Sequence, residues 1–200
     1  MTSKSKSKGN RLEREIRDSL NTAFNTEEFA RTPSSGAIMG LSNWEKNKNL
    51  ENSTKRALGS DIICPSWFQF SIECKNYGDK PNYAKVLVSS DTDLDGWVGE
   101  VLFDAINAKR TPILFFRTTR KGTFVVLPKH FITMIDASEY NYMRYKQEFV
   151  IVDANFVFTT GFALNAYNDL HHTDIQKWLE VSPIVIQTVE NMLTKKGKKK

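Results

Sequence analysis

The sequence is poor in cysteine: its 200 residues contain only two, Cys64 and Cys74. Two cysteines inside strand-like segments form neither a disulfide framework nor the paired spacing of a zinc site. No apolar run approaches the ~20 residues that a membrane-spanning helix needs. The basic residues 1–10 are followed by no apolar stretch, so they are not typical of a secretory signal. We therefore expect a protein of the reducing cytoplasm that crosses no membrane.

An excess of positive charge is also missing from the body of the chain, although the formal net charge is +5. The lysines of residues 195–200 supply all five of these charges. When the three lysines of residues 1–8 are set aside as well, residues 9–194 carry a net charge of −3. Basic arms of this kind either bind a polyanion such as DNA or only keep a chain in solution. A slightly acidic body suits a site that collects cations.

A length of 200 residues suits one domain. Composition and periodicity divide it into a basic N-terminal arm, a core, a C-terminal extension packed on that core, and a basic tail. The expected bounds of these parts are 1–8, 9–130, 131–194 and 195–200. Within the core, residues 42–56 are rich in Asn, Lys, Glu and Ser, which is typical of a flexible surface loop.

In the core, apolar periodicity predicts the order helix, three strands, helix, two strands. These elements are expected at residues 10–24, 27–33, 59–65, 67–75, 94–106, 112–118 and 123–127. Asn10 is a suitable N-cap for the first helix, with Glu13 three residues later. Only Ser66 separates the second strand from the third, so these two strands are expected to pair as a hairpin.

The C-terminal extension has weaker signals. Residues 148–152 and 155–159 look like two strands on either side of a turn at Asp153. Ser182 and Pro183 are typical of the start of a helix, which we expect to run to the end of the extension. The apolar face predicted for this helix consists of Ile186, Val189 and Leu193.

The segment WFQFSIECK, residues 67–75, alternates between two faces. One face is fully apolar, while the other ends in Glu73 and Lys75, which lie roughly 7 Å apart along a strand. If the hairpin forms, Asp61 of the preceding strand lies across from Glu73. Two carboxylates could then bind one Mg²⁺ ion, which lowers the pKa of a bound water and neutralises charge on a phosphate. The simpler interpretation is a solvated salt bridge at a strand edge.

Residues 59–61 and 73–75 resemble the PD-(D/E)xK nuclease motif, with Ser60 at the place of its proline. The predicted order of elements is similar to the core shared by that superfamily. Residues 8–15, KGNRLERE, resemble the first-helix segment of archaeal-type Holliday-junction resolvases, which recurs in phage proteins. The pair Ser34 and Ser35 falls where those resolvases carry a Ser-Gly turn near the DNA. The resemblance covers roughly residues 7–127.

The resemblance implies an α/β fold with a restriction-endonuclease-like core, in which a mixed central β-sheet is flanked by helices, with a C-terminal extension. It also implies a hydrolase, a Mg²⁺-dependent endodeoxyribonuclease in which Mn²⁺ substitutes, and within that class a junction resolvase. The implied catalytic residues are Glu13, Asp61, Glu73 and Lys75, and the metal ligands are Asp61, Glu73 and Glu13. The implied DNA-binding residues are Lys8, Arg11, Arg14, Ser34 and Ser35.

The implied partners are DNA, as a branched or four-way junction, and a second copy of the chain. The cytoplasm would be that of a bacterial or archaeal cell, or of the host if the chain is viral. Two alternatives stay open: a nuclease of the same fold that cuts flaps, ends or restriction-type sites, and a non-catalytic DNA-binding protein on a nuclease scaffold.

Other patterns allow a functional and a structural interpretation. Glu13 either completes the metal site or forms a capping box with Asn10. Arg11, Arg14 and Arg17 either contact phosphates or form a solvated helix face. Three further groups of residues have a simpler structural interpretation. The first could be a metal site but is better explained as surface residues. The second could be a base-stacking surface but is better explained as core packing, and the third could be a calcium loop but is better explained as acids at a helix start. These groups are Asp169, His171, His172 and Asp174; Tyr140, Tyr142, Arg144, Tyr145 and Lys146; and Asp91, Asp93 and Asp95.

Overall fold

The computed structural model describes residues 4–33, 59–137 and 139–197, with side chains in 11–33, 59–137 and 139–195. Ser34, Ser35 and the expected loop at 42–56 therefore lie outside the described residues, as does the side chain of Lys8. None of the helices in these ranges is both long and apolar enough to cross a membrane.

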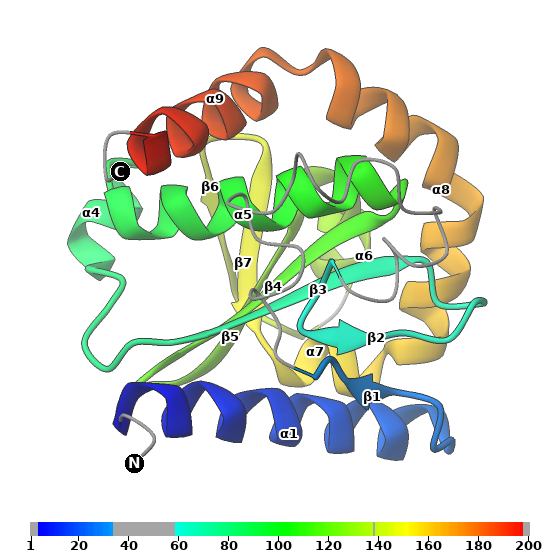
Figure 1. The fold of residues 1–200 in the computed structure, drawn as a ribbon. Coiled ribbons are helices and arrows are strands. Elements are labelled where there is room, and N and C mark those ends of the chain that lie inside the picture. Colours follow the sequence, from blue (N-terminus) through cyan, green and yellow to red (C-terminus); the bar gives the residue numbers. More distant parts are fainter. Residues whose placement is uncertain (1–3, 34–58, 138, 198–200) are drawn as a thin grey trace.

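Strands from the described ranges form one mixed sheet with the order β1-β2-β3-β4-β5-β7-β6 (Figure 1). The strands are β1 (Ala30–Arg31), β2 (Ile62–Ile63), β3 (Phe70–Asn76), β4 (Thr111–Thr118), β5 (Gly122–Pro128), β6 (Tyr142–Tyr145) and β7 (Phe149–Asp153). Strands β3 and β4 are parallel, and the other paired strands are antiparallel. The parallel pair needs a crossover connection, and this connection contains α5. The expected hairpin between β2 and β3 is confirmed.

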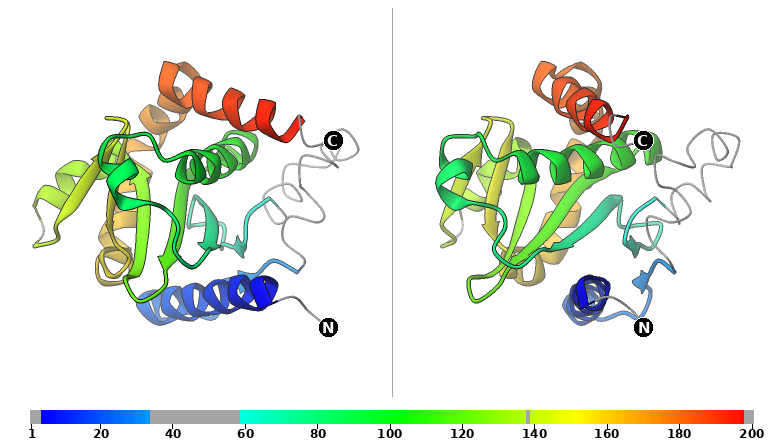
Figure 2. Two further views of the ribbon diagram at one scale, coloured as in Figure 1. Left: turned by 90° about the vertical axis from the view of Figure 1, so that its left-hand side faces the viewer. Right: turned by 60° about the vertical axis from the view of Figure 1, so that its left-hand side comes forward.

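Helices cover both faces of this sheet. They are α1 (Lys4–Phe24), α4 (Tyr83–Leu87), α5 (Thr92–Ala108), α6 (Ile132–Asp136), α7 (Asn155–Thr159), α8 (Gly161–Val181) and α9 (Pro183–Gly197), with a 3₁₀ turn η2 (Lys129–Phe131). Figure 2 shows α1 on one side of the sheet and α5 on the other, with α9 outside α5. The expected α/β architecture, a mixed sheet flanked by helices as in a restriction-endonuclease-like core, is therefore confirmed.

The apolar stripe of α1 explains its position. Leu12, Ile16 and Leu20 are at most 2 % exposed and pack into the core beneath β3. The helix starts at Lys4, six residues before the predicted N-cap, so Asn10 lies inside it. The capping-box interpretation of Glu13 is therefore wrong, because a residue in the third turn has intrahelical backbone partners already.

The C-terminal third differs most from prediction. The residues expected as a strand at 155–159 form α7, whose first turn is fixed by a hydrogen bond from the Asn155 amide to Asp153 Oδ1 (2.8 Å). A short apolar run such as this one does not distinguish a buried strand from a buried helix. The helix α9 begins at Pro183 as predicted, but its buried face is centred on Val185 and Met192.

Candidate active site

Strand β3 holds Glu73 and Lys75 on the sheet face that α5 covers. The side chain of Glu73 is 14 % exposed and that of Lys75 is 13 % exposed. The two residues form an ion pair in which Lys75 Nζ lies 2.5 Å from Glu73 Oε1. Both faces of β3 are thus packed, which contradicts the interpretation of this pair as a solvated salt bridge at a strand edge.

Asp61 immediately precedes β2, and its backbone and side chain both bond to neighbouring strands. The register pairs Ile62 with Ile72, which sets Asp61 across from Glu73 as expected. The Asp61 amide donates to the carbonyl of Ile72 (2.9 Å), and Asp61 Oδ2 accepts a hydrogen bond from the Cys74 amide (2.8 Å). The Asp61 carbonyl also accepts from the amide of Thr32, the residue after β1 (2.9 Å). Because its amide, its carbonyl and one carboxylate oxygen are all hydrogen-bonded, Asp61 has a fixed position relative to Glu73.

Helix α5 contributes a second partner for Lys75. Glu100 Oε2 lies 2.6 Å from Lys75 Nζ, so the ammonium sits between carboxylates of β3 and α5. Burial alone would lower the pKa of Lys75, but the charges of Glu73 and Glu100 outweigh it and hold that pKa well above its usual range. Lys75 is therefore a fixed positive charge at neutral pH.

The carboxylates at this site repel one another. Burial, with the nearby charge of Asp61, raises the pKa of Glu73 to about 7 despite the opposing charge of Lys75. Burial and the charge of Glu73 likewise raise the pKa of Asp104, one turn beyond Glu100 on α5. When several carboxyl groups lie close together in a poorly solvated site, a bound cation stabilises their ionised form.

Glu13 reaches the same region from α1. It is 7 % exposed, and its Oε2 accepts a hydrogen bond from Arg31 of β1 (3.3 Å). Burial raises the pKa of Glu13; the charge of Arg31 opposes this shift, while that of Glu73 adds to it. The structure thus brings Glu13, Asp61, Glu73 and Lys75 into one electrostatic cluster.

The donor set suits a cation held by two carboxylates rather than by three. Within the side chains that the structure describes, no three His, Cys, Asp or Glu residues are arranged to hold a metal ion. Mg²⁺ usually takes one or two protein carboxylates and fills its remaining positions with water and phosphate oxygens. Asp61 and Glu73 supply two such carboxylates: the residues lie across from each other in the register of β2 and β3, and the charge of Asp61 raises the pKa of Glu73.

Sequence reasoning did not find Glu100 and Asp104. Residues three or four apart on a helix share a face, so the sequence does place Trp97, Glu100 and Asp104 together on α5. It could not indicate which strand that face meets. In the structure, Asp104 lies near Glu73, Glu100 binds Lys75, and Trp97 stacks on Tyr77 (ring centroids 5.4 Å apart). Two of these pairs, Lys75 with Glu100 and Tyr77 with Trp97, therefore connect α5 to β3 and to the residue after it, while Asp104 adds a like charge near Glu73.

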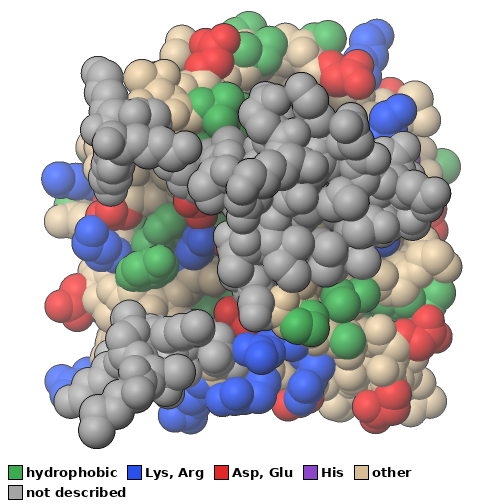
Figure 3. All heavy atoms as spheres, viewed as in Figure 1, with side chains coloured by type: hydrophobic (Ala, Val, Ile, Leu, Met, Phe, Trp, Pro, Cys, Tyr) green, Lys and Arg blue, Asp and Glu red, His purple; other side chains and the backbone are tan. Residues whose placement is uncertain are grey.

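Basic side chains lie along α1 beside this site. Arg11 and Arg14 are exposed, and Arg11 Nε lies 2.7 Å from Glu15 Oε1 in an ion pair. Arg117 of β4 binds the other oxygen of Glu15 (2.5 Å). Figure 3 shows Lys and Arg side chains gathered over the part of this face where α1 lies. These residues suit contacts with phosphates, but the ion pairs also fit a solvated helix surface.

The remaining patterns have structural roles. Tyr145 is fully buried, and Tyr140, Tyr142 and Met143 pack against the core, so packing explains the Tyr140–Lys146 segment. Asp91 is the N-cap of α5, and Asp93 and Asp95 lie in its first turn, as expected. The ring of His171 contacts that of Tyr167 on its own helix in a tilted arrangement (ring centroids 4.2 Å apart), and the described side chains around it form no metal-binding group.

Comparison with known proteins indicates a family for this chain. A protein-family model described as "Phage putative PDDEXK endonuclease" matches residues 4–179. No curated protein and no solved structure matches the chain. The matched range contains α1, β2, β3 and α5, and with them all the residues of the site described above. It also extends well past residue 127, where the resemblance seen in the sequence ended.

Proposed function

The chain belongs to this family of phage PDDEXK endonucleases, and from that premise we propose that it hydrolyses phosphodiester bonds of DNA with a divalent metal ion. The observation that carries the proposal is the pairing of Asp61 with Glu73 beside a lysine held at two points. A chain that had lost nuclease activity would be expected to lose one of these three side chains. All three are present: Asp61 is buried, and Glu73 and Lys75 are part-buried on β3, to which Asp61 is hydrogen-bonded.

In this proposal Asp61 and Glu73 hold the metal, which would be Mg²⁺, with Mn²⁺ able to replace it. A metal held there would lower the pKa of a bound water and neutralise charge on the phosphate. Glu13 completes or orients the metal site from α1. Lys75 orients the attacking water or stabilises the charge that develops on the phosphate oxygens.

Glu100 acts here as a positioning residue for Lys75. Glu73 binds the ammonium of Lys75, and a metal ion bound to the same carboxylate would compete with this interaction. Because Glu100 Oε2 is 2.6 Å from Lys75 Nζ, the lysine retains a partner when Glu73 binds metal. The partner comes from a helix whose start is capped by Asp91, so its position is well defined.

For the substrate we favour a four-way or otherwise branched DNA, cut by a homodimer. The support is the resemblance of residues 8–15 to the first helix of junction resolvases, together with the basic side chains along α1. In this proposal Lys8, Arg11, Arg14, Ser34 and Ser35 contact the DNA. The alternatives are a nuclease of this fold that cuts other DNA and a protein that binds DNA without cutting it.

The direct test offers the purified protein four-way junction, flap, linear duplex and single-stranded DNA, with Mg²⁺ or with EDTA. Paired nicks across the junction in Mg²⁺ alone support resolution. Cleavage of linear duplex at one sequence supports a restriction-type enzyme instead. Binding without cleavage of any substrate contradicts the proposed activity and leaves the non-catalytic alternative.

A further inference from the structure

Tyr77 presents an exposed aromatic ring next to the candidate active site. It is 56 % exposed, whereas Trp97, on which it stacks, is only 8 % exposed. The two ring planes are nearly parallel, with an interplanar angle of 23°. One face of Tyr77 is therefore covered by a buried tryptophan, and much of the remaining ring surface is in contact with water.

The ring has a rigid support. Trp97 belongs to α5 and packs against Phe116 of β4, with ring centroids 6.3 Å apart. The turn that carries Tyr77 is bonded to the end of β4, since the Gly78 carbonyl accepts from the Thr119 amide (2.8 Å) and the Lys80 carbonyl accepts from Thr118 Oγ1 (3.1 Å). An aromatic side chain held in this way loses little further conformational freedom on binding a ligand.

The position of the ring relates it to the chemistry. Tyr77 follows Lys75 by two residues at the end of β3, so roughly 7 Å separates their Cα atoms if the strand geometry continues. Its contact with Trp97 places it on the α5 side, the side that holds Glu73, Lys75 and Glu100. A nucleotide whose phosphate lies at Lys75 has its base within reach of Tyr77.

The structure assigns Tyr77, supported by Trp97, as a stacking site for an unpaired nucleobase beside the scissile phosphate; this inference rests on the nuclease function proposed above. Every base has an apolar π-face, so stacking on tyrosine selects for a base that is free to stack rather than for its identity. In continuous duplex both faces of a base are covered by its neighbours. The site therefore favours DNA with a gap, a branch or an end at the point of cleavage.

Two substitutions distinguish a stacking role of Tyr77 from a purely structural role in which it only covers Trp97. Tyr77→Phe keeps the aromatic face and removes only the hydroxyl. Tyr77→Leu keeps an apolar cover over Trp97 but removes the π-face, and its melting temperature reports any loss of packing. Both are made in the Glu73→Gln background and studied in EDTA, so that DNA binding is measured without cleavage.

The probe is 2-aminopurine, a base whose fluorescence is quenched by stacking. It is placed unpaired at the branch of a four-way junction and at the edge of a one-nucleotide gap, with an intact duplex as control. We expect binding to quench the probe in the parent and in Tyr77→Phe. We expect Tyr77→Leu to lose the quenching and to bind junction and gapped DNA roughly tenfold more weakly, with intact duplex binding unchanged.

Three results would overturn the assignment: no quenching in the parent complex, unchanged quenching in Tyr77→Leu, or an equal loss of affinity for all three DNAs. These outcomes are independent of the cleavage assay. A protein that binds and quenches but never cuts retains the stacking site and loses the nuclease proposal. A protein that cuts without quenching retains the nuclease proposal and loses the stacking site.

Discussion

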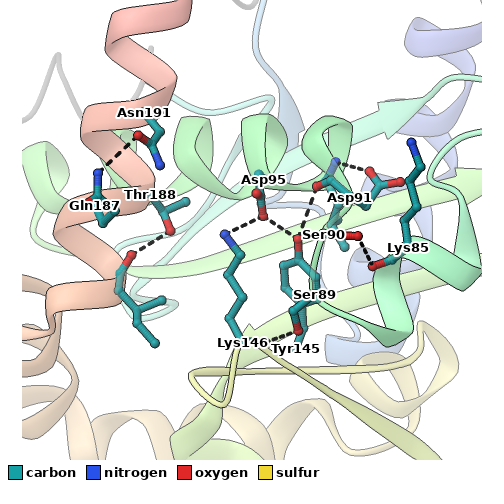
Figure 4. A network of polar contacts seen from close by, with 12 residues as sticks. Lys85, Ser89, Ser90, Asp91, Asp95, Tyr145, Lys146, Gln187, Thr188 and Asn191 are labelled. Atoms are coloured by element: carbon teal, nitrogen blue, oxygen red, sulfur yellow. Dashed lines mark hydrogen bonds and ion pairs between the residues drawn. The ribbon is translucent and has the colours of Figure 1, made fainter.

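Helix α5 carries one group of acidic side chains at its start and another from its middle onward, and the two groups differ in the hydrogen-bond partners that the fold gives them. At the N-terminal end, Asp91 accepts hydrogen bonds from the amides of Asn82, Asp93 and Leu94. One turn later, Asp95 binds the hydroxyl of Tyr145 and, at 2.8 Å, the ammonium of Lys146 (Figure 4). The protein itself supplies hydrogen-bond donors for both of these acids, so they need no outside partner.

The other group lies farther along the same helix. There Glu100 and Asp104 meet Glu73 and Asp61 across the helix–sheet interface, and Lys75 is the cation that Glu73 and Glu100 contact directly. Burial and the nearby charge of Asp61 raise the pKa of Glu73 to about 7, whereas Asp91 and Asp95 each accept hydrogen bonds from donors within the fold. The comparison separates acids whose hydrogen-bond donors come from the fold from acids that repel one another, two of whose neighbours, Asp61 and Glu73, are the metal ligands of the proposed function.

Glu73→Gln should have the largest effect on activity. It removes a proposed metal ligand and leaves the shape of the site intact, so we expect cleavage to fall at least ~100-fold while DNA binding is retained. The measurement is single-turnover cleavage alongside a binding titration. Glu180→Gln, which neutralises an exposed acid of α8, is the matched control and should cut normally. Normal cleavage by Glu73→Gln would remove Glu73 from the site.

Glu100→Gln should have a smaller effect of the same kind. Lys75 loses one of its two carboxylate partners, and we expect kcat to fall about tenfold, or ~1.4 kcal/mol in the barrier, with KM little changed. Glu100→Asp should recover part of the lost rate if it can still reach the lysine. Asp95→Asn is the control from the other acidic group and should lower stability without changing kcat. A matching loss in both variants would mean that Glu100 only stabilises α5.

The stability of the metal-free protein should fall as pH rises. The pKa of Glu73 is about 7 in the folded protein, whereas the ordinary value for a glutamate, 4.5, applies to the unfolded chain. Between these two pH values the folded protein therefore binds more protons than the unfolded chain. Stability then falls with rising pH across this window. We expect the Tm of the wild type to drop by a few °C relative to Glu73→Gln between about pH 4.5 and 7.5. A pH-independent difference in Tm would contradict the pKa shift.

Asp91→Ala should affect stability and leave the chemistry intact. The substitution removes the N-cap of α5, which costs about 1–2 kcal/mol in helix caps of this kind. Thermal unfolding measures the loss, and cleavage well below the new Tm should proceed at the wild-type rate. A strong fall in cleavage under those conditions would show that the two acidic groups are coupled through α5.

The sequence predicted the part of the site that depends on strand geometry. The two-residue period of β3 and the short connection to β2 were enough to place Asp61 across from Glu73. Glu100 and Asp104 could not be predicted as neighbours of Lys75, because the way α5 crosses the sheet depends on packing along its whole length. The helix α7 was predicted as a strand, since its five residues are too few to show a period.

Gly99 links the last helix of the described chain to this site. A Cβ atom at Gly99 would lie 2.7 Å from Met192 Cβ and 3.1 Å from the Thr188 carbonyl oxygen, so α9 rests directly against the backbone of α5. The next residue along α5 is Glu100, the partner of Lys75. Because α9 packs against the side of α5 that faces away from the sheet, it limits the distance between α5 and the sheet, and with it the position of Glu100 relative to Lys75. Because the family match ends at residue 179, before α9 begins, changes in this helix offer a way to tune the site without altering any residue in it.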